Sequence, residues 1–239
     1  MKPEEKGLQA FGFAESKEME AIKDQVAIKE FPGVPARYAF RSIPFWFILV
    51  FTLCNAFASG YNQHWVNTGV TYGFDLVTAS VLTTAAMLGS TIFKLIAGVV
   101  NDKIGVYKSA MIFSVIGALA MIICIFNHSA PKFGVMMVAC VLFGGSLCLT
   151  TLQPPALCRD TFGMRNYSSI YPVANMAMSI GTGLTYTLNA LFLEMAGSYM
   201  GSFIFNLTVI VISIIAVFIV FKTNKGMKAK YWREVGEAI

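Results

Sequence analysis

Lys94 lies deep within a long apolar segment, and its amino group is the one formal charge placed well inside any such segment of the chain. An unpaired ammonium in hydrocarbon costs roughly 2.5–3.5 kcal/mol even on a lenient insertion scale, so such a residue normally faces a polar path or an anionic partner. Ser90 and Thr91 precede it at helical spacing and add two hydroxyl groups to the same side. This pattern predicts electrostatic binding of an anion. A lysine that snorkels to the interface or pairs structurally with an acid is the alternative.

Two amide side chains lie in other apolar segments and are predicted to take part in the same binding site. Asn55 falls in the first apolar segment, and Asn175 falls in the fifth. Amides at membrane depth either line a polar path or form hydrogen bonds between helices, and the second role is the more common one. The predicted binding residues are therefore Lys94, Ser90, Thr91, Asn55 and Asn175.

Downstream of Lys94, a set of four residues is predicted to form a conformational latch: Gly98, Asp102, Lys103 and Gly105. Gly98 is expected to allow close contact between helices, and Gly105 is expected to allow a tight turn. Asp102, followed by Lys103, is expected to face the N-terminus of a neighbouring helix, whose dipole favours an anion. An ordinary basic loop between two membrane spans is the alternative interpretation.

The sequence predicts neither a metal site nor a cofactor site. All five cysteines lie in apolar segments without the spacing of metal ligands, and they are interpreted as small packing residues. The sequence contains no glycine-rich phosphate loop, and it contains no Ser, His and Asp residues placed so that they could form a catalytic triad. Enzymatic activity and nucleic-acid binding are therefore not expected.

The composition indicates the elements that must position these residues. Hydrophobic residues make up 56% of the chain and charged residues 13%, and the mean hydropathy is +0.64. The charged fraction is about half of that in a soluble domain. Apolar segments of roughly 20 residues suffice to cross a bilayer, and a lone span must be helical to satisfy its backbone. The prediction is an all-α membrane protein with six transmembrane helices in one bundle, at residues 43–62, 76–100, 107–126, 133–158, 168–193 and 198–221.

The polar flanks and the basic residues predict the orientation. Residues 1–42 are expected to be a cytoplasmic linker or tail, and residues 222–239 a basic cytoplasmic tail. On the side opposite to these flanks, Lys132 is the only Lys or Arg near the ends of the spans. Basic loops stay on the cytoplasmic side, so both termini are expected there, in an inner or plasma membrane.

Three stretches carry a resemblance to a known family. Residues 98–108 resemble the loop signature of the major facilitator superfamily, G-x-x-x-D-[RK]-x-G-[RK]-[RK], from which Val106 and Tyr107 depart. Residues 3–12 and 160–171 resemble two cytoplasmic loops of its oxalate/formate antiporter-like and monocarboxylate transporter-like branches. The resemblance implies that the six spans are similar to helices seven through twelve, the C-terminal six-helix bundle of such a transporter.

The resemblance also implies a substrate class. In those branches the eighth helix commonly bears an Arg eight residues before the loop Asp, and this cation faces the substrate carboxylate. Lys94, Gly98 and Asp102 occupy the same frame here. An ammonium lacks the planar fork of an arginine, and residues 168–193 contain no second Lys or Arg of the kind expected for oxalate. A small monocarboxylate is therefore the expected substrate.

The expected function is secondary active transport of a small organic anion, by exchange or by proton symport. The expected partners are a small carboxylate, the lipid bilayer and a second, N-terminal six-helix bundle, because one bundle supplies half of a transport path. That bundle is expected to be a separate chain or missing. Two alternatives remain open, a half-transporter that pairs with a second copy of itself and a membrane scaffold or assembly subunit without transport.

Overall fold

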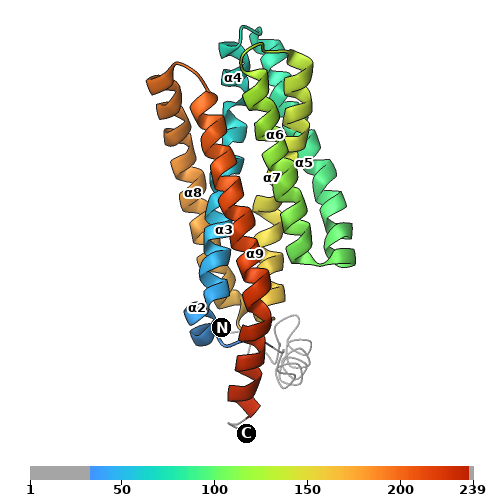
Figure 1. Ribbon diagram of the computed structural model, residues 1–239, viewed down its shortest axis with the longest axis vertical. Helices are drawn as coiled ribbons and strands as arrows, with labels where there is room; N and C mark the ends of the chain where they lie inside the picture. The colour runs from blue at the N-terminus through green and yellow to red at the C-terminus, as the bar shows by residue number, and fades with distance from the viewer. Residues whose placement is uncertain (1–32, 237–239) are drawn as a thin grey trace, which may run out of the picture.

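The computed structural model describes residues 33–236, which form an elongated bundle of long helices (Figure 1). The predicted motif in residues 3–12, and the predicted linker up to residue 32, lie outside the described residues. Figure 1 places the beginning and the end of the described chain at the same end of the bundle, which we call the terminal end. The helices are α2 (Ala36–Arg41), α3 (Ile43–Gly60), the 3-10 turn η2 (Tyr61–His64), α4 (Trp65–Thr71), α5 (Leu76–Ile104), α6 (Val106–Asn127), α7 (Phe133–Phe162), α8 (Tyr167–Ala196) and α9 (Met200–Gly236).

The described part of the chain is all-helical apart from one isolated bridge between Gly33 and Gly163. Five of its helical segments are long and apolar enough to cross a membrane: Ile43–Thr71, Leu76–Ile104, Val106–Asn127, Phe133–Phe162 and Met200–Lys228. The 30-residue helix α8 is not among them, because hydroxyl and amide residues recur along it. It nevertheless packs along α3 as the sixth long helix. The predicted class, an all-α membrane protein with a six-helix bundle, is confirmed.

Local signals explain several helix boundaries. Asp75 caps α5 because its carboxylate accepts a hydrogen bond from the Thr78 backbone N–H at 3.0 Å and one from the Thr78 hydroxyl at 2.5 Å. A single residue, Gly105, separates α5 from α6, and its φ of +87° is a conformation that favours glycine. The helices outrun the predicted spans, since α5 continues to Ile104 and α9 continues through the predicted tail to Gly236.

The helices α5 and α7 cross in close contact. A Cβ atom added to Gly89 would collide with the carbonyl group of Val141, and one added to Gly144 would collide with the backbone of Gly89 and Ser90. Small residues let membrane helices approach in this way. The contact therefore brings one face of α5 directly against α7.

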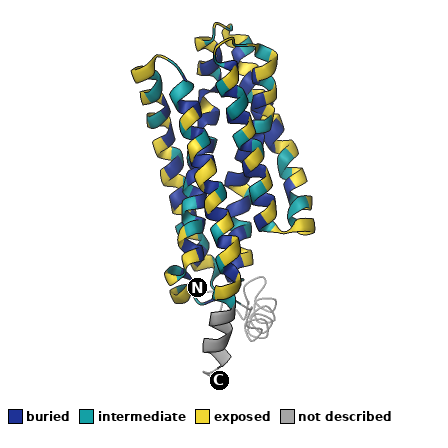
Figure 2. Cartoon of the chain, viewed as in Figure 1, coloured by how far each residue is buried: buried dark blue, intermediate teal, exposed yellow. Residues whose placement is uncertain are grey.

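Buried residues line the inside of the bundle, and many large apolar residues face outward (Figure 2). Leu95 is 72% exposed and Phe126 is 81% exposed. In water such an apolar surface would be costly, whereas acyl chains solvate it at little cost. The outer surface thus fits a lipid environment.

Candidate functional site

A cavity of about 270 Å³ lies between α3, α5, α7 and α8, and Lys94 forms part of its wall. All four helices contribute side chains to it, and η2 contributes two amides. The lining residues are Ser59, Gly60, Asn62, Gln63, Met87, Ser90, Lys94, Leu147, Thr150, Thr151, Met178, Thr182 and Tyr186. The structure therefore places the predicted charge beside a hollow within the bundle.

Lys94 is half-buried, and its amino group makes no hydrogen bond or ion pair with another residue between 33 and 228. The described residues of the lining carry hydroxyl and amide groups, and none of them is an Asp or Glu. A cation at membrane depth requires a counter-charge or hydration. The wall thus presents one positive charge with neutral hydrogen-bonding groups around it, which suits an anionic solute.

Ser90 lies in the same wall because it precedes Lys94 by about one helical turn. It is 4% exposed and lies at the α5–α7 crossing, where its backbone N–H faces Gly144. The absence of a side chain at Gly144 lets Ser90 and Lys94 approach the hydroxyl-bearing face of α7. The predicted pair of Ser90 and Lys94 is therefore brought together at one cavity.

Asn55 lies behind this wall rather than in it. It is fully buried, and its side-chain N–H donates to the carbonyl oxygen of Phe51 at 2.8 Å. Its own backbone carbonyl oxygen lies 3.1 Å from the hydroxyl of Thr150, which does line the cavity. Asn55 therefore does not line the cavity itself, and it contacts the site only indirectly, through its hydrogen bond with Thr150.

Thr91 and Asn175 lie outside the cavity wall, in contrast to the prediction. Thr91 is exposed, and its hydroxyl donates to the Met87 carbonyl oxygen at 3.1 Å. One residue rotates a helix by about 100°, so Thr91 points away from the direction of Ser90. Asn175 is exposed on α8, and among the described residues its carbonyl oxygen accepts a hydrogen bond from Ser179 at 3.3 Å.

The prediction missed the part of the wall that α7 and α8 supply. Met178, Thr182 and Tyr186 are spaced by four residues on α8, and Thr150 and Thr151 are neighbours on α7. The spacing on α8 is a signal for one helical face. It does not by itself indicate which face looks toward Lys94, because that depends on how the helices are rotated within the bundle.

Of the predicted latch residues, Gly98 behaves differently from the expectation. A Cβ atom at Gly98 would meet nothing within 4 Å, so no helix is packed closely against it, and the close approach occurs at Gly89 instead. Asp102 and Lys103 are exposed, without a hydrogen bond or ion pair to another described residue. Gly105 forms the expected tight turn, with a φ of +87°.

The terminal end is held by buried polar contacts that sequence reasoning did not find. The amide N–H of Gln153 on α7 lies 3.1 Å from the side-chain oxygen of Asn101 on α5 and 3.3 Å from the hydroxyl of Ser109 on α6. Nearby, the Tyr107 hydroxyl lies 2.8 Å from that of Thr161. These bonds link α5, α6 and α7 where the predicted latch stands exposed.

Another set of polar contacts adds α9 to this end of the bundle. The side-chain N–H of Asn224 donates to the Tyr107 hydroxyl at 2.6 Å, and the amine of Lys228 donates to the Asp160 carbonyl oxygen at 2.7 Å. The bond between Asn224 and Tyr107 is buried and costly to break, because the freed groups find no water, whereas the bond of Lys228 is exposed. The terminal end is therefore cross-linked between α6, α7 and α9.

The sequence model of the major facilitator superfamily matches residues 45–234. Eleven chains from solved structures match as well. One of them is described as an auto-inhibited peptide transporter of the POT family, with 17% identity and a TM-score of 0.64, and the match covers 76% of this chain and 37% of that chain. At such identity the likeness shows the fold, and the chain spans less than half the length of that transporter. No curated protein matches the chain. Because the family match covers most of its residues, the chain belongs to the major facilitator superfamily, a family of multi-pass membrane transporters.

Proposed function

We propose that this bundle forms one half of a secondary transporter for small organic anions, with Lys94 as the residue that binds the anionic group. The observation that carries the proposal is the half-buried amine of Lys94 in the wall of the cavity, without an acidic partner among the described residues. A substrate carboxylate would supply the missing negative charge and would bind as a charge-assisted hydrogen bond.

A small monocarboxylate fits this site better than a dicarboxylate or a peptide. The cavity presents one cation, and α8 from Tyr167 to Ala196 contains no Lys or Arg. Its volume of about 270 Å³ is below the usual range of pockets for drug-sized ligands, about 300–1,000 Å³. The hydroxyl groups of Ser90, Thr150 and Thr182 are suited to a second oxygen of the same carboxylate. These features agree with the monocarboxylate transporter-like branch that the loop motifs resemble.

A second six-helix bundle is part of the proposal, because polar side chains stand exposed beside the cavity at membrane depth. They lie on the two helices that flank it: Ser80, Thr84 and Thr91 on α5, and Asn175, Ser179 and Thr187 on α8. The hydroxyls of Ser80, Thr91 and Ser179 donate to carbonyl oxygens of their own helices, but the side-chain amide of Asn175 makes no hydrogen bond with a described residue. Acyl chains cannot supply a partner for it, whereas a facing bundle or a water-filled path would. The second bundle would come from another part of a longer chain, from a separate chain or from a second copy.

The exposed turn between α5 and α6 has a place in the same mechanism. Asp102 and Lys103 lie at the terminal end, which the basic residues predict to be cytoplasmic, in an inner or plasma membrane. In another transport state Asp102 would contact a helix N-terminus of the facing bundle. Gly105 would supply the turn that presents it.

The test is uptake of radiolabelled formate, acetate, lactate and oxalate into cells or vesicles that contain the chain with a second six-helix bundle. We expect Lys94→Gln to lower monocarboxylate uptake by about tenfold to a hundredfold, the value of one hydrogen bond to a charged group. Lys94→Arg should retain part of the activity, and Lys132→Gln, a charge removed at the opposite end, should retain all of it. Unchanged uptake by Lys94→Gln would overturn the proposal.

Liposomes that contain the purified chain alone distinguish the sources of the second bundle. Saturable flux from the chain alone, together with cross-linking between copies, indicates a pair of identical halves. Flux that requires a co-reconstituted six-helix partner indicates a separate chain or a longer one. No flux under either condition would favour the scaffold alternative and contradict the transport proposal.

A further inference from the structure

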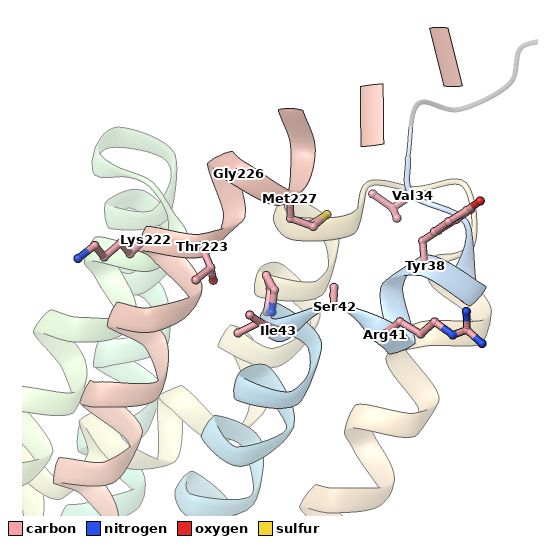
Figure 3. A pocket seen from close by; sticks show the side chains of 10 residues that line it. Val34, Tyr38, Arg41, Ser42, Ile43, Lys222, Thr223, Gly226 and Met227 are labelled. Atoms are coloured by element: carbon pink, nitrogen blue, oxygen red, sulfur yellow. The ribbon is translucent and has the colours of Figure 1, made fainter. Parts of the chain in front are cut away.

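The cations at the terminal end do not contribute to the Lys94 cavity. Arg41 and Lys222 line a separate cavity of about 620 Å³ between α2, the beginning of α3 and the last part of α9, and this cavity shares no lining residue with that of Lys94. Figure 3 shows Arg41 and Lys222 on its opposite sides, with their charged ends pointing away from it. A second charge that acts on a substrate at Lys94 therefore has to come from elsewhere in the bundle.

His64 lies at the end of the bundle opposite to the terminal end, in η2, the turn that leads from α3 into α4 (Figure 1). It is 8% exposed, and neither nitrogen of its ring has a hydrogen-bond partner among the described residues. The other histidine of the chain, His128, has one, since its Nδ1 lies 2.7 Å from the hydroxyl of Tyr72. A buried polar group without a partner is costly and therefore calls for an explanation.

Three tyrosine rings lie around His64. The ring of Tyr61 stacks on the imidazole at a centroid distance of 5.9 Å, and the rings of Tyr199 and Tyr186 lie at 6.1 Å and 6.4 Å. Aromatic rings attract a cation through their faces at distances of about 6 Å. The surroundings of His64 therefore contain groups that can stabilise the protonated ring after it has lost contact with water.

The wall of the Lys94 cavity begins next to His64 in the chain. Asn62 and Gln63 line the cavity, and Tyr186 lines it from α8. The side-chain oxygen of Asn62 is buried and has no hydrogen-bond partner in the described part of the chain, so it is an acceptor in the same turn for a ring N–H. A proton on His64 therefore lies one side chain away from the cavity that contains Lys94.

Among the described residues, no other buried group at this end changes its charge near neutral pH. The helices packed against η2 are α3, α4, α5 and α8. Apart from phenols and thiols, which ionise above neutral pH, their titratable groups toward this end and at the cavity are Asp75, Lys94 and Glu194. Asp75 and Glu194 are exposed, and Lys94 is the cation of the site. Histidine is the side chain whose ordinary pKa lies nearest to neutrality.

From this arrangement we infer that His64 binds a proton that is transported together with the anion, which makes the chain part of a proton symporter rather than an exchanger. The inference rests on the proposed function, because the anion at Lys94 supplies the coupling. Lys94 and a protonated His64 repel each other, whereas a carboxylate in the cavity attracts both. Each ligand therefore strengthens the binding of the other by the same factor. One proton binds to the imidazole for each carboxylate and is released with it on the other side, so no net charge crosses the membrane.

The first test measures the initial uptake of formate, acetate and lactate, each separately, into vesicles that contain the chain with a second six-helix bundle. Uptake by protein-free vesicles is subtracted, because undissociated acids cross lipid unaided. We expect an acidic outside to raise uptake by the natural chain at least about fivefold, the lower end of typical coupling between two sites. His64→Gln should remove this stimulation, whereas exchange against carboxylate loaded inside the vesicles should continue. His128→Gln, which changes the other histidine at the same end, should retain the stimulation.

The outcomes separate the inference from the proposed function. Stimulation that persists in His64→Gln overturns the proton site and leaves the anion site standing. The same holds if uptake by the natural chain requires Lys94 but does not respond to acid. Uptake that is unchanged in Lys94→Gln, or absent from the natural chain under every condition, contradicts the proposed function and the inference with it.

The second test observes the proton directly and does not require His64→Gln to fold. In His128→Gln, His64 is the only histidine of the chain, so its ring signal can be followed by NMR in histidine-labelled protein together with the second bundle. We expect the signal to titrate between about pH 4 and 8, and a transported carboxylate to raise the proton affinity of the ring about tenfold. Lys94→Gln should abolish the effect of the carboxylate but not the titration. A signal that responds to neither pH nor carboxylate would overturn the inference, and so would a titration that the carboxylate leaves unchanged.

Discussion

The hydroxyl of Thr150 on α7 lies 3.1 Å from the backbone carbonyl oxygen of Asn55 on α3 and 3.2 Å from that of Ser146 on its own helix. Thr150 also lines the Lys94 cavity. One side chain therefore faces the proposed substrate and holds two helices of the cavity wall together. A substitution of Thr150 is therefore expected to affect α3 as well, although the side chain of Asn55 on that helix does not line the cavity.

Thr150→Val removes this connection with almost no change in volume. We expect a loss of about 0.5–1.5 kcal/mol in stability, the net value of one hydrogen bond, together with weaker uptake of the monocarboxylate. Thermal unfolding of the purified variant in detergent and uptake assays measure the two effects. Thr151→Val is the control, because Thr151 lines the same wall but its hydroxyl contacts only carbonyl oxygens of its own helix, at 3.5 Å. Equal stability of the two variants would contradict the role of Thr150.

Gly144→Ala tests the crossing of α5 and α7. A Cβ atom at this position would collide with the backbone of Gly89 and Ser90, which cannot move aside as a flexible side chain can. Overpacking of this kind typically costs about 1–3 kcal/mol, so we expect a lower unfolding temperature and a displaced Lys94. Gly98→Ala should be neutral or stabilising, because its Cβ enters open space and alanine favours helix. A stable Gly144→Ala variant would show that the two helices are not in close contact.

Tyr107→Phe tests the polar contacts that join α6, α7 and α9. The lost hydroxyl accepts a hydrogen bond from the side chain of Asn224 and contacts the hydroxyl of Thr161, and all three residues are buried. Leaving two buried groups unpaired should cost about 1–3 kcal/mol in the free energy of unfolding. Tyr171→Phe provides the comparison, because the hydroxyl of Tyr171 makes no hydrogen bond with a described residue and its ring stacks on Tyr167 at 5.4 Å. The contacts are unimportant if both variants unfold alike.

Asp75 predicts a dependence of stability on pH. Hydrogen bonds from the hydroxyl and the backbone N–H of Thr78 lower the pKa of its carboxyl group below the ordinary value of 3.8. A lowered pKa in the folded state means that the cap stabilises α5 above pH 3.8 and that this contribution is lost as the pH falls through the folded pKa. Asp75→Ala should therefore unfold at a lower temperature than the natural chain at pH 7, and the difference should shrink in acid. A difference independent of pH would show that the charged cap is not its cause.

The membrane helices and the central charge could be predicted from the sequence because both follow from local composition. A span must be apolar over its whole length, and a lysine within it is conspicuous wherever the helix packs. Ser90 followed from Lys94 by helical spacing alone. Each of these inferences uses one segment at a time, and the structure places both residues at one cavity.

The remaining lining residues depend on how the helices are rotated against one another. Thr150, Thr182 and Tyr186 belong to helices whose inward face the hydropathy pattern does not reveal. The same reason explains the glycines: Gly98 and Gly89 share a helix and a residue type, but only Gly89 meets α7. The helix α8 shows that composition alone is also insufficient. It packs in the bundle, but it contains too many polar residues to be identified as a membrane span by its hydropathy.

The link of one residue between α5 and α6 leaves no slack between them. Gly105 offers two soft dihedral angles, and the helices on either side are continuous for 29 and 22 residues. A shift of α5 along its axis, caused by binding at Lys94, must therefore move α6 as well. The helix α6 in turn packs against α7 and α9. Movement of α5 at the cavity is thus transmitted through α6 to the far side of the bundle, and lengthening the link at Gly105 by a few flexible residues would uncouple α5 from α6.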